Sequence, residues 1–317
     1  MHVRVGWRRP LESEETSLLR HPLLERIGRT PLVELQKIPG PRGPRVFAKL
    51  ESANPGGSVK DRAARGIVTA AIRRGELPGR RLLDSTSGNT GIAYAMLGAA
   101  LGFGVTLCVP ASASPERRRI LGAYGCEVIE TDPLEGSDGA IVRARDLLAE
   151  RPRLYFYADQ YSNPANPAAH EETTGPEILR QLRGLPFDLF VAGLGTSGTF
   201  VGVSRFLRRA SPHTRLVSVE PDAPFHGLEG LKHMATALVP AIYDRSLADA
   251  GVGVRTEEAH EMTRRLGREE GLFVGPSSGA AVVAALRVGR ETGARTVAVV
   301  LPDGGDRYLS DRFWEAA

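Results

Sequence analysis

Short apolar runs alternate with longer amphipathic segments along most of the chain. The short runs are typical of strands buried on both faces, and the longer segments carry apolar residues at helical spacing. In the first half, the pattern predicts strands at 46–51, 81–84, 105–109, 127–131 and 154–157 and helices at 60–74, 89–101, 115–124 and 139–150. In the second half, it predicts helices at 169–183, 199–209, 257–270 and 279–290 and strands at 188–192, 215–220, 272–274 and 296–301. This alternation indicates an α/β fold with mainly parallel sheets.

The two series of elements predict two sheets and therefore two domains. The break between them falls near 160–167, where Asn163-Pro164 and Asn166-Pro167 interrupt the pattern. A cleft between two such domains is a usual place for a small-molecule site.

The composition is that of an ordinary globular protein, with 42% hydrophobic and 25% charged residues. The formal net charge of +4 comes from 41 Lys and Arg against 37 Asp and Glu, so the charges are nearly balanced. The run Arg117-Arg118-Arg119 is therefore predicted to be a solvated helix face, and no nucleic-acid partner is expected.

Three features bear on where the protein works. Neither Cys108 nor Cys126 has a second Cys or a His at metal-ligand spacing, so we expect a reducing cytoplasm, no disulfide framework and no metal site. The first ten residues lack the apolar run of a signal peptide. The uncharged stretch 85–115 is interrupted by glycines, and we interpret it as a buried helix and strand rather than a membrane span.

Four polar, glycine-rich clusters fall at predicted turns that lead into helices. At such turns the backbone N–H groups point outward and the helix end favours anions. The clusters are 54–61 (NPGGSVKD), 86–91 (TSGNTG), 193–199 (GLGTSGT) and 275–279 (GPSSG).

The cluster at 193–199 also fits a dinucleotide site. Gly193, Gly195 and Gly198 form a GxGxxG that follows a predicted strand and opens a helix. Glu220 ends the next strand about where a ribose-binding acid would lie. An NAD-binding oxidoreductase is therefore an alternative. It leaves the other clusters unexplained, and the hydroxyl groups of this cluster suit a terminal phosphate monoester better.

The cluster at 275–279 is a GxSxG, as in the nucleophile turn of α/β-hydrolases. That fold needs an acid and then a histidine after the serine, whereas the last histidine, His260, precedes Ser277. The hydrolase interpretation therefore fails.

Lys60 closes the first glycine cluster and opens a predicted helix. A cation there opposes the positive end of the helix dipole, which makes it a poor choice for a surface residue. A buried, positively biased site lowers the pKa of a lysine amine and favours its reaction with an aldehyde. Together with three further anion-binding turns, this position indicates a lysine that carries an aldehyde cofactor.

These motifs together resemble those of the cysteine synthase and cystathionine β-synthase family, the fold type II pyridoxal-phosphate enzymes. Besides the four clusters, the resemblance includes 27–32 (IGRTPL), 159–167 (DQYSNPANP), 173–177 (TTGPE) and 305–310 (GDRYLS), so it covers nearly the whole chain. It implies pyridoxal 5'-phosphate as cofactor, held in a cleft between two α/β domains, and a cytoplasmic homodimer. The smaller, mobile domain would comprise 46–160, and the larger one 1–45 and 161–317.

The resemblance also implies roles for individual positions. Lys60 matches the catalytic lysine that forms a Schiff base with the cofactor, Asn89 matches the residue that binds its ring hydroxyl oxygen, and Ser277 matches the partner of the pyridine nitrogen. The phosphate-binding turn is matched by Gly195, Thr196, Ser197, Gly198 and Thr199, and the substrate carboxylate site by Thr86, Ser87, Thr90 and Gln160.

The implied reaction is a β-replacement on an O-activated L-serine, either O-acetylserine or O-phosphoserine, with L-cysteine as product. The alternative within the family is cystathionine β-synthase, which joins serine and homocysteine. Intact Lys60, Asn89 and Ser277 argue against a catalytically silent binding protein. Sulfide, thiosulfate and a sulfur-carrier protein remain open as sulfur donors.

The segment 226–234 (HGLEGLKHM) departs from the loop expected of family members that use O-acetylserine. Lys232 resembles the phosphate-reading position of members that use O-phosphoserine. A cation facing the leaving group would favour dianionic phosphate over acetate. The alternative is that Lys232 and His233 are merely solvated loop residues.

Overall fold

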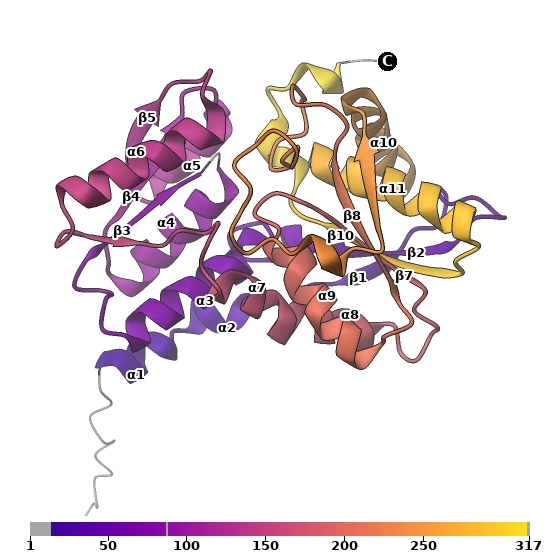
Figure 1. Ribbon diagram of the computed structural model, residues 1–317, viewed down its shortest axis with the longest axis horizontal. Helices are drawn as coiled ribbons and strands as arrows, with labels where there is room; N and C mark the ends of the chain where they lie inside the picture. The colour runs from indigo at the N-terminus through magenta and orange to yellow at the C-terminus, as the bar shows by residue number, and fades with distance from the viewer. Residues whose placement is uncertain (1–13, 87, 316–317) are drawn as a thin grey trace, which may run out of the picture.

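Two β-sheets, each covered by helices, form two lobes that lie side by side (Figure 1). The computed structural model describes residues 14–86 and 88–315, so the predictions for the first ten residues and for Ser87 lie outside the described residues. The predicted α/β class and the two mainly parallel sheets are confirmed.

The smaller lobe is built on four parallel strands in the order β5-β4-β3-β6. Its strands are β3 (Arg81–Ser85), β4 (Val105–Pro110), β5 (Glu127–Thr131) and β6 (Tyr155–Tyr157), and its helices are α3 (Lys60–Arg73), α4 (Asn89–Leu101), α5 (Pro115–Ala123) and α6 (Gly136–Glu150). Successive strand side chains point to opposite faces. Leu107 of β4 accordingly packs in the cluster with α3 and α4, and Cys108 packs in the cluster with α6. Because both faces are covered, the strands need the continuous apolar runs seen in the sequence.

The larger lobe is built on six strands in the order β1-β2-β10-β7-β8-β9, of which only β1 runs antiparallel to its neighbour. The strands are β1 (Leu32–Glu34), β2 (Arg45–Leu50), β7 (Leu189–Gly193), β8 (Arg215–Pro221), β9 (Ala250–Val254) and β10 (Thr296–Leu301). α8 (Gly175–Gln181) and α9 (Gly198–Ala210) cover one face, and α10 (Thr256–Glu270) and α11 (Pro276–Thr292) cover the other.

The predicted domain boundary at residue 46 is wrong for the strand that follows it. β2 pairs with β1 and β10 and therefore belongs to the larger sheet, although α3, which comes next, packs on α4 of the smaller lobe. Conversely, Leu24 of α2 (Pro22–Arg26) packs in the core of the smaller lobe. An apolar run predicts a buried strand but does not say which sheet buries it. The division into a mobile and a fixed domain stays a prediction.

Three other local predictions differ from the structure. The strand expected at 272–274 forms only a single bridge, Val274 to Gly304, because the five residues between α10 and α11 are too few to cross a sheet. The helix expected from 169 begins earlier, as α7 (Ala165–Ala169). Pro167 fits in its first turn, where no backbone N–H is needed. β9 was missed because its alternating glycines weaken the strand pattern.

In the described part of the chain, none of the helices is both long and apolar enough to cross a membrane. The uncharged stretch 85–115 instead forms α4 and β4, as predicted.

Candidate active site

Four helices of the two lobes begin around one space between the sheets. Lys60 is the first residue of α3, Asn89 of α4 and Gly198 of α9, while Ser277 is the second residue of α11. All four line a connected pair of chambers. The positive ends of four helix dipoles therefore surround a space suited to an anionic ligand.

The two chambers share part of their walls and therefore adjoin. We name each chamber by a residue that lines that chamber and not the other. The Arg117 chamber and the Ser277 chamber have Lys60, Asn89, Gly195 and Thr196 in common. Of the other residues predicted for the site, the Arg117 chamber is lined by Thr86, Thr90, Gln160 and Lys232, and the Ser277 chamber by Ser197, Gly198, Thr199 and Ser277. The structure thus brings together every described residue predicted for the site.

Lys60 is half-buried and lies near one acid and two arginines. Burial lowers the pKa of its amine, the charge of Asp303 offsets part of this effect, and the charges of Arg117 and Arg307 lower the pKa further. The start of α3 is held in place by a hydrogen bond of 2.8 Å from the Val59 N–H to the Pro302 carbonyl oxygen. The amine therefore loses its proton more readily than a surface lysine and can act as a nucleophile or a base.

Asn89 is held between two residues that follow β10. Its Nδ2 donates to Asp303 Oδ2 at 2.5 Å, and its Oδ1 accepts from Arg307. Arg307 also donates to the carbonyl oxygen of Gly56, and Tyr308 donates to Asp303 Oδ2 at 2.7 Å. The glycine clusters 54–61 and 86–91 are thereby both tied to the segment that follows β10, beside Lys60.

The turn 195–199 joins β7 to α9 and leaves one buried hydroxyl group free. Side chains could not replace its glycines, because a Cβ on Gly195 would collide with the Gly230 carbonyl oxygen and one on Gly198 with the Asn166 side chain. Ser197 adopts a left-handed conformation with φ of 69°. Its Oγ is buried and has no hydrogen-bond partner among the described residues. The turn therefore offers unused donors to a ligand.

Two residues behind this turn fix its threonines. Thr196 Oγ1 accepts from Asn166 Nδ2 at 3.1 Å, and Thr199 Oγ1 lies 3.3 Å from His170 Nε2. Burial and, to a smaller extent, the charge of Arg62 lower the pKa of His170 to about 3. His170 is therefore neutral at physiological pH. It opens a π-helical turn, a feature frequent at functional sites.

Thr90 and Gln160 form a bonded pair in the wall of the Arg117 chamber. Thr90 Oγ1 donates to Gln160 Oε1 at 2.6 Å, and Gln160 Nε2 donates to the Ser85 carbonyl oxygen at 2.7 Å. These bonds connect the first turn of α4 to the end of β3.

Arg117 is the main site residue that sequence analysis missed, since we predicted it on a solvated helix face. Its side chain is 2% exposed, forms an ion pair with Glu229 and lies 4.7 Å from the centre of the Tyr308 ring. A Cβ on Gly88 would collide with it. These three neighbours are far apart in the sequence, so nothing in the arginine run distinguishes Arg117 from Arg119, which is exposed as predicted.

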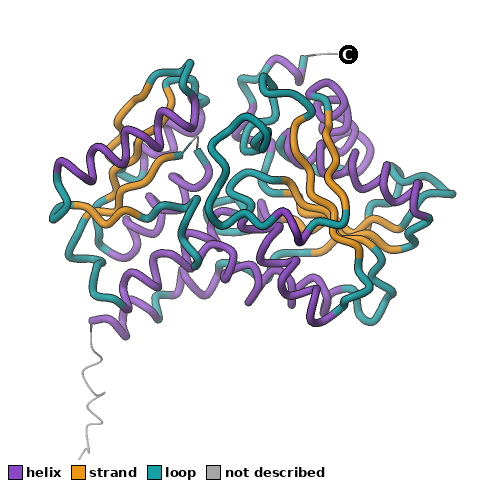
Figure 2. Tube along the Cα trace, in the orientation of Figure 1, coloured by secondary structure: helices purple, strands orange, loops and turns teal. Residues whose placement is uncertain are grey.

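Lys232 is buried, which contradicts the alternative that it is solvated. Its Nζ donates to Asp138 Oδ1 at 2.9 Å and Ser137 Oγ at 3.2 Å, both at the start of α6, and lies 5.1 Å from the centre of the Tyr161 ring. Figure 2 shows the long loop of the larger lobe that carries Lys232 running alongside the smaller lobe. Reading of a substrate phosphate by Lys232 stays a prediction.

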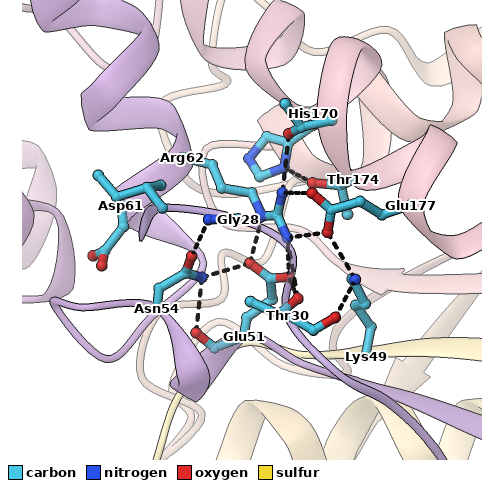
Figure 3. Close-up of polar contacts among 12 residues, drawn as sticks. Gly28, Thr30, Lys49, Glu51, Asn54, Asp61, Arg62, His170, Thr174 and Glu177 are labelled. Carbon is cyan, nitrogen blue, oxygen red and sulfur yellow. Dashed lines mark hydrogen bonds and ion pairs between the residues drawn. The ribbon is translucent and has the colours of Figure 1, made fainter. Parts of the chain in front are cut away.

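A buried charge network, which we name the Arg62 network, fixes α3 two residues after Lys60 (Figure 3). Arg62 Nε donates to Glu51 at 2.7 Å and Arg62 Nη1 to Glu177 at 2.8 Å, and Lys49 Nζ also donates to Glu177 at 2.8 Å. Burial would raise the pKa of Glu177, but hydrogen bonds and the charge of Arg62 outweigh it and lower the pKa to about 2. The network joins β2, α3 and α8 and so connects the two lobes.

Comparison with known proteins agrees with the resemblance stated from the motifs. A family model described as pyridoxal-phosphate dependent enzyme matches residues 23–303. Cysteine synthase of Aquifex aeolicus is 46% identical over 299 residues, which cover 92% of this chain and 91% of that protein. Cysteine synthase of Staphylococcus aureus is 42% identical over 295 residues, which cover 90% and 94%.

Solved structures agree as well. A cysteine synthase of Entamoeba histolytica superimposes with a TM-score of 0.87 at 36% identity, covering 99% of this chain and 95% of that one. An O-ureido-L-serine synthase superimposes with a TM-score of 0.87 at 40% identity, covering 93% and 95%. The predicted family and cofactor are confirmed, and the dinucleotide interpretation of 193–199 is set aside. The chain belongs to the family of pyridoxal-phosphate dependent enzymes, among the cysteine synthases and their fold type II relatives.

Proposed function

We propose that this protein is a cysteine synthase, which replaces the oxygen-linked substituent of an O-activated L-serine by sulfur and forms L-cysteine. The observation that carries the proposal is the shared wall of the two chambers, where Lys60 lies with Gly195 and Thr196 of the predicted phosphate turn. A covalently held aldehyde whose phosphate binds that turn requires this proximity. The relatives named cysteine synthase support the same function.

The Ser277 chamber fits pyridoxal phosphate. The free Ser197 hydroxyl and the N–H groups at the start of α9 suit the phosphate, and Lys60 suits the aldehyde carbon. Asn89 would bind the ring oxygen, and the buried Ser277 would face the ring nitrogen as a neutral partner. When bound, the cofactor supplies an electron sink that makes the Cα proton of the substrate acidic.

The chain's own residues then bind the substrate and move its proton. Thr86, Thr90 and Gln160 would hold the α-carboxylate in the Arg117 chamber, with Ser87 as a further match from the sequence. Lys60 Nζ, with its lowered pKa, takes the Cα proton and later returns it. The loop that carries Glu229 and Lys232 closes against the smaller lobe and keeps water out of the chambers.

The direct test is product analysis with the purified holoenzyme. O-acetylserine, O-phosphoserine and serine are each supplied with sulfide, and serine is supplied separately with homocysteine. We expect L-cysteine from an O-activated serine, and at least about a 10³-fold lower rate for Lys60→Ala. Lys37→Ala, which removes an exposed lysine, is the matched control and should retain the wild-type rate. Faster formation of cystathionine than of cysteine would establish the cystathionine β-synthase alternative instead.

We also infer a cytoplasmic homodimer, which the family resemblance alone supports. Light scattering on the eluted protein is expected to give twice the chain mass of 34.1 kDa, and the single chain mass would refute the dimer. Cell fractionation tests the location. The sulfur donor is identified by replacing sulfide with thiosulfate or with a thiocarboxylated carrier protein in the same assay.

A further inference from the structure

The two sides of the Arg117–Glu229 ion pair differ in how firmly they are held. Arg117 is 2% exposed, whereas the Glu229 side chain is 33% exposed. The Tyr308 ring covers the guanidinium, and Tyr308 is itself bonded to Asp303. Gly88 leaves room for the arginine side chain where a Cβ would collide with it. Arg117 is therefore fixed in the wall of its chamber.

Glu229 has a partly exposed side chain that can turn toward water. It is flanked by Gly230, whose φ of 87° lies in the left-handed region, and by Leu228, which is buried. If the ion pair breaks, the Glu229 carboxylate moves from a partly exposed position into water, and the cost in free energy is small. An arginine left without an acid in this chamber would remain a buried, unpaired charge, which costs much more. Any anion that displaces Glu229 must therefore take its place on Arg117.

The guanidinium also has unused hydrogen-bonding capacity. Its Nε is buried and has no hydrogen-bond partner among the described residues. Arg117 lines the same chamber as Lys60, Thr86 and Thr90, and its charge acts on the Lys60 amine. A buried, incompletely bonded arginine that faces a chamber beside the reacting lysine is suited to bind an anionic part of the substrate.

We propose that Arg117 binds the leaving group of the substrate as it becomes an anion, and that Glu229 occupies this subsite in its absence. The inference rests on the proposed function. In the elimination half of that reaction, the Cα proton moves to Lys60 Nζ and the Cα–H electron pair becomes the second Cα–Cβ bond. The Cβ–O bond breaks with its electron pair on oxygen, so a small oxyanion departs. Acetate and phosphate share this chemistry, and both match the planar fork of an arginine.

The competing explanation is that the Arg117–Glu229 pair only holds the lobes together. In that case, removing either partner would open the cleft and weaken every ligand alike, including amino acids that have no leaving group. Under the proposal, removing Glu229 improves the binding of small oxyanions, and removing Arg117 weakens it. The two explanations therefore predict changes of opposite sign for Glu229→Gln.

The experiment measures binding of acetate and of inorganic phosphate to the holoenzyme by calorimetry at constant ionic strength. L-alanine is present at saturation, because it fills the α-carboxylate site and has no leaving group. We expect Glu229→Gln to lower the Kd of at least one anion about 5- to 10-fold, since it removes the competing carboxylate. Glu150→Gln removes an exposed acid of an Arg–Glu pair on α6 and should change Kd less than about 2-fold.

Arg117→Met supplies the second arm of the experiment. It is expected to raise the Kd of the same anion about 10-fold or more, and to abolish the gain when combined with Glu229→Gln. Its affinity for L-alanine should stay within about 3-fold of wild type. Arg117→Lys, which keeps the charge and loses the fork, should give an intermediate Kd and serves if Arg117→Met does not fold.

Weaker anion binding in Glu229→Gln would overturn the proposal, as would an equal loss of L-alanine and anion affinity in the arginine variants. The ratio of acetate to phosphate affinity shows which leaving group the subsite suits. None of these measurements requires turnover, so the subsite can fail while cysteine is still formed, or be present in a protein that forms none.

Discussion

Arg62 and Arg117 are both arginines of the smaller lobe with 2% of the side chain exposed, yet their surroundings differ. Every side-chain nitrogen of Arg62 donates a hydrogen bond, and its acids Glu51 and Glu177 are 0% and 10% exposed. Arg117 has an unbonded Nε and a single acid that is 33% exposed. One arginine is enclosed by fixed partners, and the other has a partner that can leave.

The difference separates a structural charge from one available to a ligand. A buried ion pair stabilises a fold only when all of its hydrogen-bonding groups are satisfied, which is the case around Arg62. At Arg117, full satisfaction would leave nothing for a ligand to bind. The incomplete bonding of Arg117 in the wall of a chamber is therefore the feature that marks it as part of the site.

The strongest test of this distinction is the removal of Arg62. Arg62→Met would leave Glu51 and Glu177 buried with only Lys49 nearby, so we expect the free energy of unfolding to fall by about 3–5 kcal/mol. Urea denaturation measures this loss. Arg45→Met is the control, because Arg45 and Glu34 form an exposed pair whose removal should cost less than about 1 kcal/mol. A loss as small as that of the control would show that the Arg62 network is not structural.

In contrast to Arg62→Met, Arg117→Met should reduce catalytic activity strongly and the free energy of unfolding only slightly. Its partner Glu229 can turn to water, so the free energy of unfolding should fall by less than about 1 kcal/mol. Loss of a charge-assisted hydrogen bond to the leaving group should lower kcat/KM about 10- to 100-fold. Steady-state kinetics and urea denaturation on the same preparation compare the two effects. Equal losses of stability in Arg62→Met and Arg117→Met would remove the distinction between them.

His170, which lies near Arg62, is expected to make the stability of the protein depend on pH. Because burial and Arg62 lower its pKa from 6.5 to about 3, the folded protein does not bind a proton there between these values, whereas the unfolded chain does. The contribution of neutral His170 to stability is thus fully present above pH 6.5 and is lost as the pH falls toward 3. From pH 7 to pH 5 this loss is about 1–2 kcal/mol.

Variants isolate this contribution from other titrating groups. Burial raises the pKa of Asp61 and Asp84 to about 7, so these acids change stability in the opposite direction over the same range. The measurement is therefore the difference between wild type and His170→Gln in urea denaturation at pH 7 and pH 5. The wild type should lose about 1–2 kcal/mol more than the variant on acidification. The same pH dependence in both proteins would mean that His170 is protonated in the folded state.

Local patterns in the sequence predicted the fold and the glycine clusters around the chambers, and the family resemblance then implied the individual site residues. Strands buried on both faces are continuous apolar runs, and glycine clusters mark the helix starts that now surround the chambers. The partners of buried charges depend instead on contacts between distant segments. Arg117 meets Gly88, Glu229 and Tyr308, which no local pattern connects. For the same reason we predicted β2 in the wrong domain, since its partners β1 and β10 lie on either side of it in the sequence.

Substitution of Lys232 should have the smallest effect on catalysis, because the charge of Lys232 is already largely offset by Asp138 at 2.9 Å. If Lys232 reads a phosphate leaving group, Lys232→Ala should lower the ratio of kcat/KM for O-phosphoserine over O-acetylserine by about 2- to 5-fold, in line with a partly exposed ion pair. Asp138→Asn frees the lysine and should raise this ratio by a similar factor. The two variants must move the ratio in opposite directions, since one removes the cation and the other its competitor. If instead both lower the rate with the two substrates equally, the pair only holds the loop against α6, and Arg117 alone is left to receive the leaving group.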